Sequence, residues 1–127
     1  MIRRVAQRRR LGGPDGGQGA GERGSVAAEL AVALPAVVVV ILLGVGALMA
    51  ASTQVRLQDV AADAARLVAR GEPEGRASGV VAQAVPGARA ATSRRGDLVC
   101  VTASVDARVA GVPIPLRAAS CALGGGL

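Results

Sequence analysis

The sequence predicts an α+β protein, in which one long N-terminal helix precedes a small antiparallel β hairpin or meander. Three observations support this class. Residues 30–51 form an apolar stretch without a single charge, residues 54–70 continue with helical periodicity, and residues 97–109 alternate between apolar and polar. The chain has 127 residues, which leaves room for at most one small domain beside a membrane segment. We therefore predict a helix with a transmembrane half and an amphipathic half, followed by the β-containing part.

The composition indicates that the apolar residues serve a membrane span more than a large core. The chain is 51% hydrophobic but contains no Phe, Tyr or Trp, so a core must be filled by smaller side chains. Its formal net charge of +6 is concentrated at the N-terminus, where residues 1–24 hold six Arg against two acids, and no aromatic residue is interleaved with them. This distribution differs from a nucleic-acid-binding footprint, so we expect no nucleic-acid partner.

Residues 30–51 predict the membrane span itself. A helix of this length measures about 33 Å, enough for a hydrocarbon core of about 30 Å. We assign residues 25–53 to the transmembrane helix and expect the lipid bilayer as a partner. A cleaved signal peptide is the alternative, because residues 47–52 resemble a cleavage site, but signal-peptide apolar regions usually run about 7–15 residues. The Arg cluster before the span predicts a single-pass cell-membrane protein with a cytoplasmic N-terminus and an extracytoplasmic C-terminal part.

Several local features modify this long helix. Residues 11–24 are rich in Gly, and we expect them to lack regular structure within a cytoplasmic leader, residues 1–24. Pro35 is expected to bend the span or to remove one hydrogen bond. Gly46 and Ala50 stand four apart, as do Ala47 and Ala51, a spacing that lets helices pack closely in lipid; the alternative is that small residues are simply abundant in this chain.

Residues 54–71 are predicted to continue the helix as an amphipathic segment. The apolar face comprises Leu57, Val60, Ala61, Ala64, Leu67 and Val68. The charged face comprises Arg56, Asp59, Asp63, Arg66 and Arg70. Gly71 followed by Pro73 predicts the end of this helix, and a second, shorter helix is expected over 74–84.

Residues 72–127 are predicted to form a small extracytoplasmic α+β domain. Residues 88–93 are expected to pair with strand 97–109 through a turn at 94–96. A second turn at Ala110-Gly111 makes paired residues sum to 221, which places the apolar side chains on one face. The same register puts Pro113 and Pro115 at non-hydrogen-bonded positions, where an N–H is not needed.

This register also places Cys100 opposite Cys121. Residues opposed at a non-hydrogen-bonded site have Cα atoms about 4.5 Å apart, which suits a disulfide in an oxidising compartment. Two buried free thiols are the alternative. Two Cys without any His supply too few ligands for a zinc site, and the lack of His excludes a Ser-His-Asp arrangement. We therefore predict no metal, no cofactor, no catalytic residue and no enzymatic activity.

The junction before the span has a specific pattern. A basic leader ends at Gly24, Glu29 follows five residues later, and the apolar stretch begins at once. This resembles the prepilin processing site of type IV pilins, where a membrane peptidase cuts after the Gly and the mature chain has Glu at its fifth position. The resemblance implies cleavage between Gly24 and Ser25 and an assembly role for Glu29. In that role the carboxylate would pair with the new ammonium group of a neighbouring subunit; the alternative is an ordinary interfacial acid.

More narrowly, residues 24–72 are similar to the TadE-like minor pilins, or pseudopilins, of the tight-adherence (Flp) system. The resemblance implies a function in assembling an adhesion pilus or related secretion apparatus. It also implies a prepilin peptidase, a pilus assembly platform and other pilin subunits, contacted through the apolar helix, as partners.

Two residues depart from the patterns: Leu30 replaces the aromatic residue usual in major Flp pilins, and Ser25 replaces a large apolar residue common in type IV pilins. The alternatives are an uncleaved, membrane-anchored extracytoplasmic binding domain and a membrane-tethered hydrolase, which the lack of His disfavours.

Overall fold

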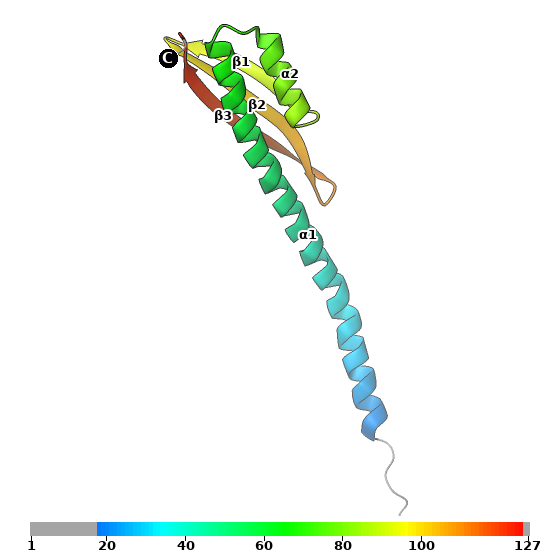
Figure 1. Ribbon diagram of the computed structural model, residues 1–127. Helices are drawn as coiled ribbons and strands as arrows, with labels where there is room; N and C mark the ends of the chain where they lie inside the picture. Colours follow the sequence, from blue (N-terminus) through cyan, green and yellow to red (C-terminus); the bar gives the residue numbers. More distant parts are fainter. Residues whose placement is uncertain (1–17, 126–127) are drawn as a thin grey trace, which may run out of the picture. The chain divides into compact units, whose positions relative to one another are not determined.

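A computed structural model describes residues 18–125, which form two helices and one three-stranded antiparallel sheet (Figure 1). The elements are α1 (Gln18–Ala69), α2 (Glu74–Ala84), β1 (Arg89–Arg95), β2 (Leu98–Val109) and β3 (Val112–Leu123). The strands are ordered β1-β2-β3, a simple meander. The predicted α+β class is therefore confirmed. The described part of the chain divides after Val38 into an N-terminal unit and a C-terminal unit.

Helix α1 has 52 residues and runs through Pro35 without interruption. It begins at Gln18, so the prediction that residues 11–24 lack regular structure is wrong for 18–24, while 11–17 lie outside the described residues. Extending an existing helix requires no new nucleation, and Ala20, Glu22 and Arg23, which favour helix, interrupt the glycines of this segment.

The C-terminus of α1 is closed by a Schellman motif around Gly71, where the sequence predicted the helix to end. Gly71 has a φ of 90°, and its N–H donates to the carbonyl of Val68 at 3.0 Å. The N–H of Glu72 donates to the carbonyl of Leu67 at 3.1 Å. These two bonds satisfy carbonyls that the helix end would otherwise leave without partners. The second helix then spans Glu74–Ala84, as predicted.

The β2–β3 hairpin has the predicted register throughout. Its pairs run from Val109↔Val112 at the turn to Leu98↔Leu123 at the other end. The turn residues Ala110 and Gly111 both have positive φ, 50° and 81°, as a type I′ turn requires.

The predicted turn of the first hairpin is wrong in detail. Arg95 pairs with Leu98, so the two-residue turn is Gly96-Asp97 and not Arg94-Arg95-Gly96. Gly96 supplies the positive φ, 59°, that a tight hairpin turn needs at its first central position. The pairing therefore continues through both arginines before the chain reverses.

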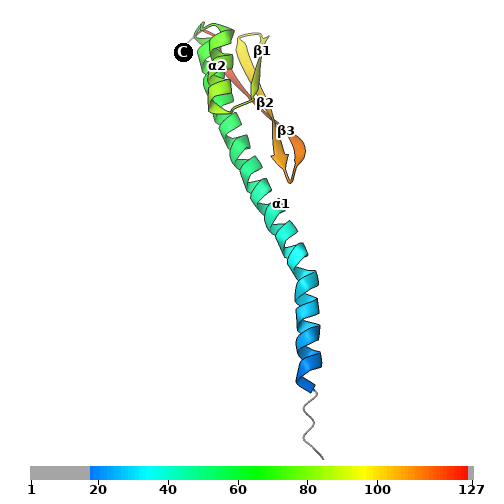
Figure 2. The same ribbon diagram turned by 90° about the vertical axis from the view of Figure 1, so that its right-hand side faces the viewer.

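The core of the C-terminal unit lies between one face of the sheet and the two helices, which lie on the same side of it (Figure 2). The α1 face predicted to be apolar is buried or half-buried along its whole length, and its charged face is exposed. The largest fully buried side chains are Leu57, Val81 and Val101. With no aromatic residue in the chain, this core is made of Val, Leu and Ala, and it buries no charged residue in the described part of the chain.

Candidate membrane and assembly surface

Most of the apolar stretch of α1, residues 30–45, is exposed and has no partner within the described chain. Its most apolar 18-residue window has a mean hydropathy of 2.8 and is 0% buried, so α1 is long and apolar enough to cross a membrane as a single span. Val32, Val40 and Leu48 are 78%, 67% and 73% exposed. A helix that is hydrophobic all round belongs in lipid or against other helices, because no water-facing side is left.

The predicted processing and assembly residues all lie on this helix. Gly24 and Ser25 are exposed in the second turn from its start, and a Cβ at residue 24 would meet nothing within 4 Å. Glu29 lies five residues on, which is about 7.5 Å along the axis. The surface of Glu29 is framed by small and apolar neighbours, Ala28, Val32, Ala33 and Ala36.

This placement leaves the Glu29 carboxylate available to another molecule. Among the ion pairs between described residues, Asp63–Arg66 and Glu72–Arg76, both at 3.3 Å, none involves Glu29. Glu29 is thus an exposed acid beside an apolar surface, a position where an external cation is the natural counter-charge.

One of the two predicted small-residue pairs is used within the chain itself. Gly46 and Ala50 are half-buried, and a Cβ at residue 46 would lie 2.8 Å from Cγ1 of Val109, at the tip of the β2–β3 hairpin. Gly46 therefore packs against the chain's own hairpin, and not against a neighbouring helix as the spacing suggested. Ala47 and Ala51 remain exposed.

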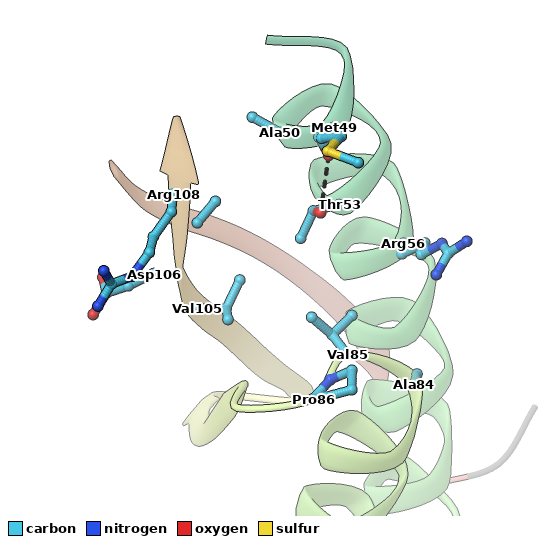
Figure 3. Close-up of a pocket in the computed structure, with 11 residues that line it drawn as sticks. Met49, Ala50, Thr53, Arg56, Ala84, Val85, Pro86, Val105, Asp106 and Arg108 are labelled. Carbon is cyan, nitrogen blue, oxygen red and sulfur yellow. Dashed lines mark hydrogen bonds between the residues drawn. The ribbon is translucent and has the colours of Figure 1, made fainter. Parts of the chain in front are cut away.

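A cavity of about 270 Å³ opens between α1, the end of α2 and β2 (Figure 3). Met49, Val85 and Val105 contribute apolar walls, whereas Arg56 and Arg108 lie at its borders and point away from one another. The Thr53 hydroxyl that lines it donates to the carbonyl of Met49 at 3.0 Å. Within residues 18–125, no three His, Cys, Asp or Glu side chains gather in a way that could hold a metal ion.

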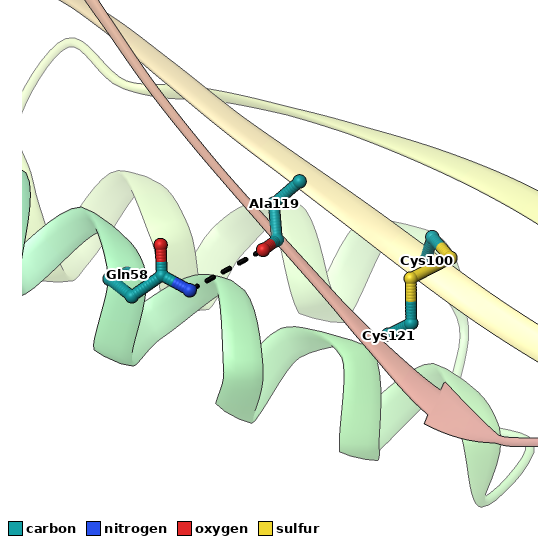
Figure 4. Close-up of a disulfide and its surroundings, with 4 residues drawn as sticks. All are labelled: Gln58, Cys100, Ala119 and Cys121. Atoms are coloured by element: carbon teal, nitrogen blue, oxygen red, sulfur yellow. Dashed lines mark hydrogen bonds between the residues drawn. A yellow bond between two sulfur atoms is a disulfide. The ribbon is translucent and has the colours of Figure 1, made fainter.

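The predicted cysteine pair lies at disulfide distance (Figure 4). The Sγ atoms of Cys100 and Cys121 are 2.06 Å apart, and their Cα atoms 4.0 Å. The bond joins the central strand β2 to the edge strand β3, near the end of the hairpin remote from its turn.

Two glutamines that the sequence analysis did not single out attach β3 to α1. Gln54 Nε2 donates to the carbonyl of Arg117 at 2.7 Å, and Gln58 Nε2 donates to that of Ala119 at 3.4 Å. Both carbonyls lie at non-hydrogen-bonded positions of the β2–β3 register, so they face the free edge of the sheet. The signal in the sequence was a pair of amides four residues apart, beside the apolar face of α1.

The match to a known protein family falls on the same helix as the predicted processing and assembly residues. A family model described as TadE-like protein matches residues 24–66. We call residues 24–66, which are similar to this family, the TadE-like segment. The TadE-like segment begins at Gly24, includes Glu29 and the whole apolar stretch, and ends within the amphipathic half of α1. The match covers the predicted processing junction, the apolar stretch and part of the amphipathic half, and it does not extend to α2 or the sheet. No curated protein and no solved structure matches the chain.

Proposed function

We propose that this TadE-like protein is a membrane-anchored minor pilin, which takes part in assembling a Flp-type adhesion pilus or a related secretion apparatus. The observation that carries the proposal is the start of the TadE-like segment at Gly24, shortly before an apolar stretch that the rest of the described chain leaves largely uncovered. In the membrane, lipid covers this helix. In a fibre, neighbouring pilin helices take the place of lipid, so the same surface serves both states.

Processing at Gly24 gives Glu29 its role in this proposal. Residues 1–24 act as the leader, which a prepilin peptidase removes, and cleavage creates an ammonium group at Ser25. The exposed Glu29 carboxylate pairs with this group on an adjacent subunit, which lowers the cost of holding either charge beside apolar surface. Because Gly24 lies inside α1, the peptidase must open the first turns of the helix, and a helix-destabilising glycine assists that opening.

The remaining parts follow from this topology. The Arg-rich leader stays in the cytoplasm, and the β-sheet part is extracytoplasmic, where Cys100 and Cys121 are oxidised. The assembly platform and other pilin subunits are the expected partners. A reporter that is active only outside the cytoplasm, fused after Leu127, should be active in the native host.

N-terminal sequencing of membrane-extracted protein tests the proposal. The mature chain should begin at Ser25; Gly24→Val should leave the precursor intact, because a branched side chain obstructs access to the backbone. Gly21→Val is the matched control, since residue 21 is also an open helical glycine, and it should be processed normally. Glu29→Gln should be processed but poorly incorporated into fibres. A natural chain that begins at Met1 would favour the uncleaved anchored domain, and one that begins near Ser52 would indicate a cleaved signal peptide.

A further inference from the structure

The tip of the β2–β3 hairpin lies beside a part of α1 that belongs to the apolar stretch. Val109 covers Gly46, with Cγ1 2.8 Å from a Cβ placed at residue 46. Gly46 precedes Ala51, the last residue of the apolar stretch, by five residues, or about 7.5 Å along the helix. Arg56, the first charge after Glu29, lies about 15 Å beyond Gly46. Measured along α1, the hairpin tip therefore lies within the apolar stretch, more than one helical turn before the C-terminal end of that stretch.

The composition of the tip matches this position. Residues 109–116, Val-Ala-Gly-Val-Pro-Ile-Pro-Leu, contain no charged or polar side chain. Val112 and Ile114 belong to the sheet face that packs on the helices, yet they remain 61% and 38% exposed. Within one turn of Gly46, Leu48 and Met49 on α1 are 73% and 67% exposed. The tip thus places exposed apolar side chains next to the part of α1 whose own apolar side chains are exposed.

The backbone of the tip is also suited to an apolar environment. Pro113 and Pro115 occupy the non-hydrogen-bonded pairs of β3, so their nitrogens face the free edge of the strand. Any other residue would present an unpaired N–H there, which costs several kcal/mol in a medium without water. Arg108, directly before the tip, is exposed and has the length to reach lipid phosphates while its stem lies along the apolar surface.

We propose that the β2–β3 tip is a second membrane contact, which inserts Val112 and Ile114 into the headgroup and upper acyl region of the bilayer at the C-terminal end of the span. The occupant of this surface is lipid, because the tip is continuous with the apolar stretch that the bilayer covers. An apolar element immersed by about 5–10 Å is typical of interfacial anchors. The inference relies on the anchoring of α1 in a membrane, as in the proposed function, but not on processing or on a fibre.

The chain contains no Trp, so a single introduced Trp reports on its own site. Val112→Trp places it at the tip. Leu123→Trp is the matched control, because Val112 and Leu123 are the first and last residues of β3 and are 61% and 62% exposed. Val40→Trp marks the span. Each full-length variant is reconstituted into vesicles of phosphatidylethanolamine and phosphatidylglycerol, without bromine or with bromine on the acyl chains near the headgroup. Because Val40 lies at the middle of the span, Val40→Trp is measured with bromine near the ends of the acyl chains.

The tip Trp should show a blue-shifted emission and lose intensity when the lipids are brominated, whereas the Leu123→Trp emission should stay red and unquenched. Ile114→Trp should give the same emission and quenching as Val112→Trp. A local folding defect caused by one substitution would then not explain the result. Red, unquenched emission at both tip positions, with quenching at Val40→Trp, would overturn the inference while leaving the anchored span intact. Blue-shifted emission without bromine quenching would also overturn it, since the tip would then face protein, such as a second copy. Lack of quenching at Val40→Trp would contradict the membrane anchor itself, and with it the tip contact.

Discussion

The two halves of α1 use similar residues in opposite ways. Leu42, in the apolar stretch, is 58% exposed, whereas Leu57, four turns further on, is 0% exposed. The difference lies in the residues between the apolar ones. Charges at residues 56, 59, 63, 66 and 70 confine the apolar side chains of the second half to one face, which the sheet and α2 cover. The first half has no such charges, so no single intramolecular partner can cover it, and its burial depends on lipid or other chains.

The largest expected effect is the difference in free energy of unfolding between a substitution in the amphipathic half and one in the apolar half. Leu57→Ala should lower the free energy of unfolding of the C-terminal unit by about 2–5 kcal/mol, because it opens a cavity in a core that contains no aromatic side chain to fill it. Leu42→Ala is the matched control and should change this free energy by less than about 0.5 kcal/mol. Denaturant unfolding of the full chain in detergent measures both. Equal losses for the two variants would show that the halves are not energetically distinct.

The second prediction concerns how the C-terminal unit compensates for its small core. A bond between Cys100 and Cys121, 21 residues apart in sequence, should stabilise the unit by about 3 kcal/mol, because it restricts the unfolded chain. Removing both thiols as Cys100→Ser with Cys121→Ser should therefore lower its melting temperature, with the apolar half of α1 unaffected. Mass spectrometry of unreduced, exported protein should find the two peptides linked. Two alkylatable thiols in that material would favour free cysteines instead.

A third prediction examines the place where the hairpin meets the apolar stretch. Gly46→Val should destabilise the C-terminal unit by about 1–3 kcal/mol, because the side chain overlaps Val109. Gly44→Val, two residues away, meets nothing within 4 Å and should be nearly neutral. Thermal unfolding compares the two variants, and limited proteolysis at the tip should detect release of the hairpin in Gly46→Val alone. The same stability for both would place the hairpin tip away from Gly46.

The smallest expected effect lies at the sheet edge. Gln54→Leu should cost about 0.5–1.5 kcal/mol, because the Arg117 carbonyl loses its 2.7 Å hydrogen bond. Gln83→Leu, at an exposed position of α2, serves as the control and should be close to neutral. Hydrogen exchange of β3 amides provides the more sensitive readout. Unchanged exchange in Gln54→Leu would mean that the amide does not hold the edge strand to α1.

The elements governed by short-range patterns were predictable from the sequence. The uncharged stretch of residues 30–51 predicts the span, and the alternation around Ala110-Gly111 predicts the whole β2–β3 register, including Cys100 opposite Cys121. These features depend on side-chain periodicity within one helix or one hairpin, so neighbouring residues define them. The TadE-like junction at Gly24 and Glu29 is likewise a matter of local spacing, and the family match starts there.

Other features depended on how the elements pack. The contact between Gly46 and Val109 and the bond from Gln54 to Arg117 each join residues more than sixty positions apart. The spacing of Gly46 and Ala50 predicted packing against another helix, and nothing in the local pattern of α1 indicated that Val109 covers Gly46 and leaves Gly44 open. The difference between the two glycines arises in the tertiary structure, because the sheet packs on the amphipathic half of α1 and thereby places the tip of the β2–β3 hairpin against Gly46. The sequence by itself therefore determined which surfaces are apolar, and only the tertiary structure decided which of them the chain covers itself and which it leaves for lipid or a partner.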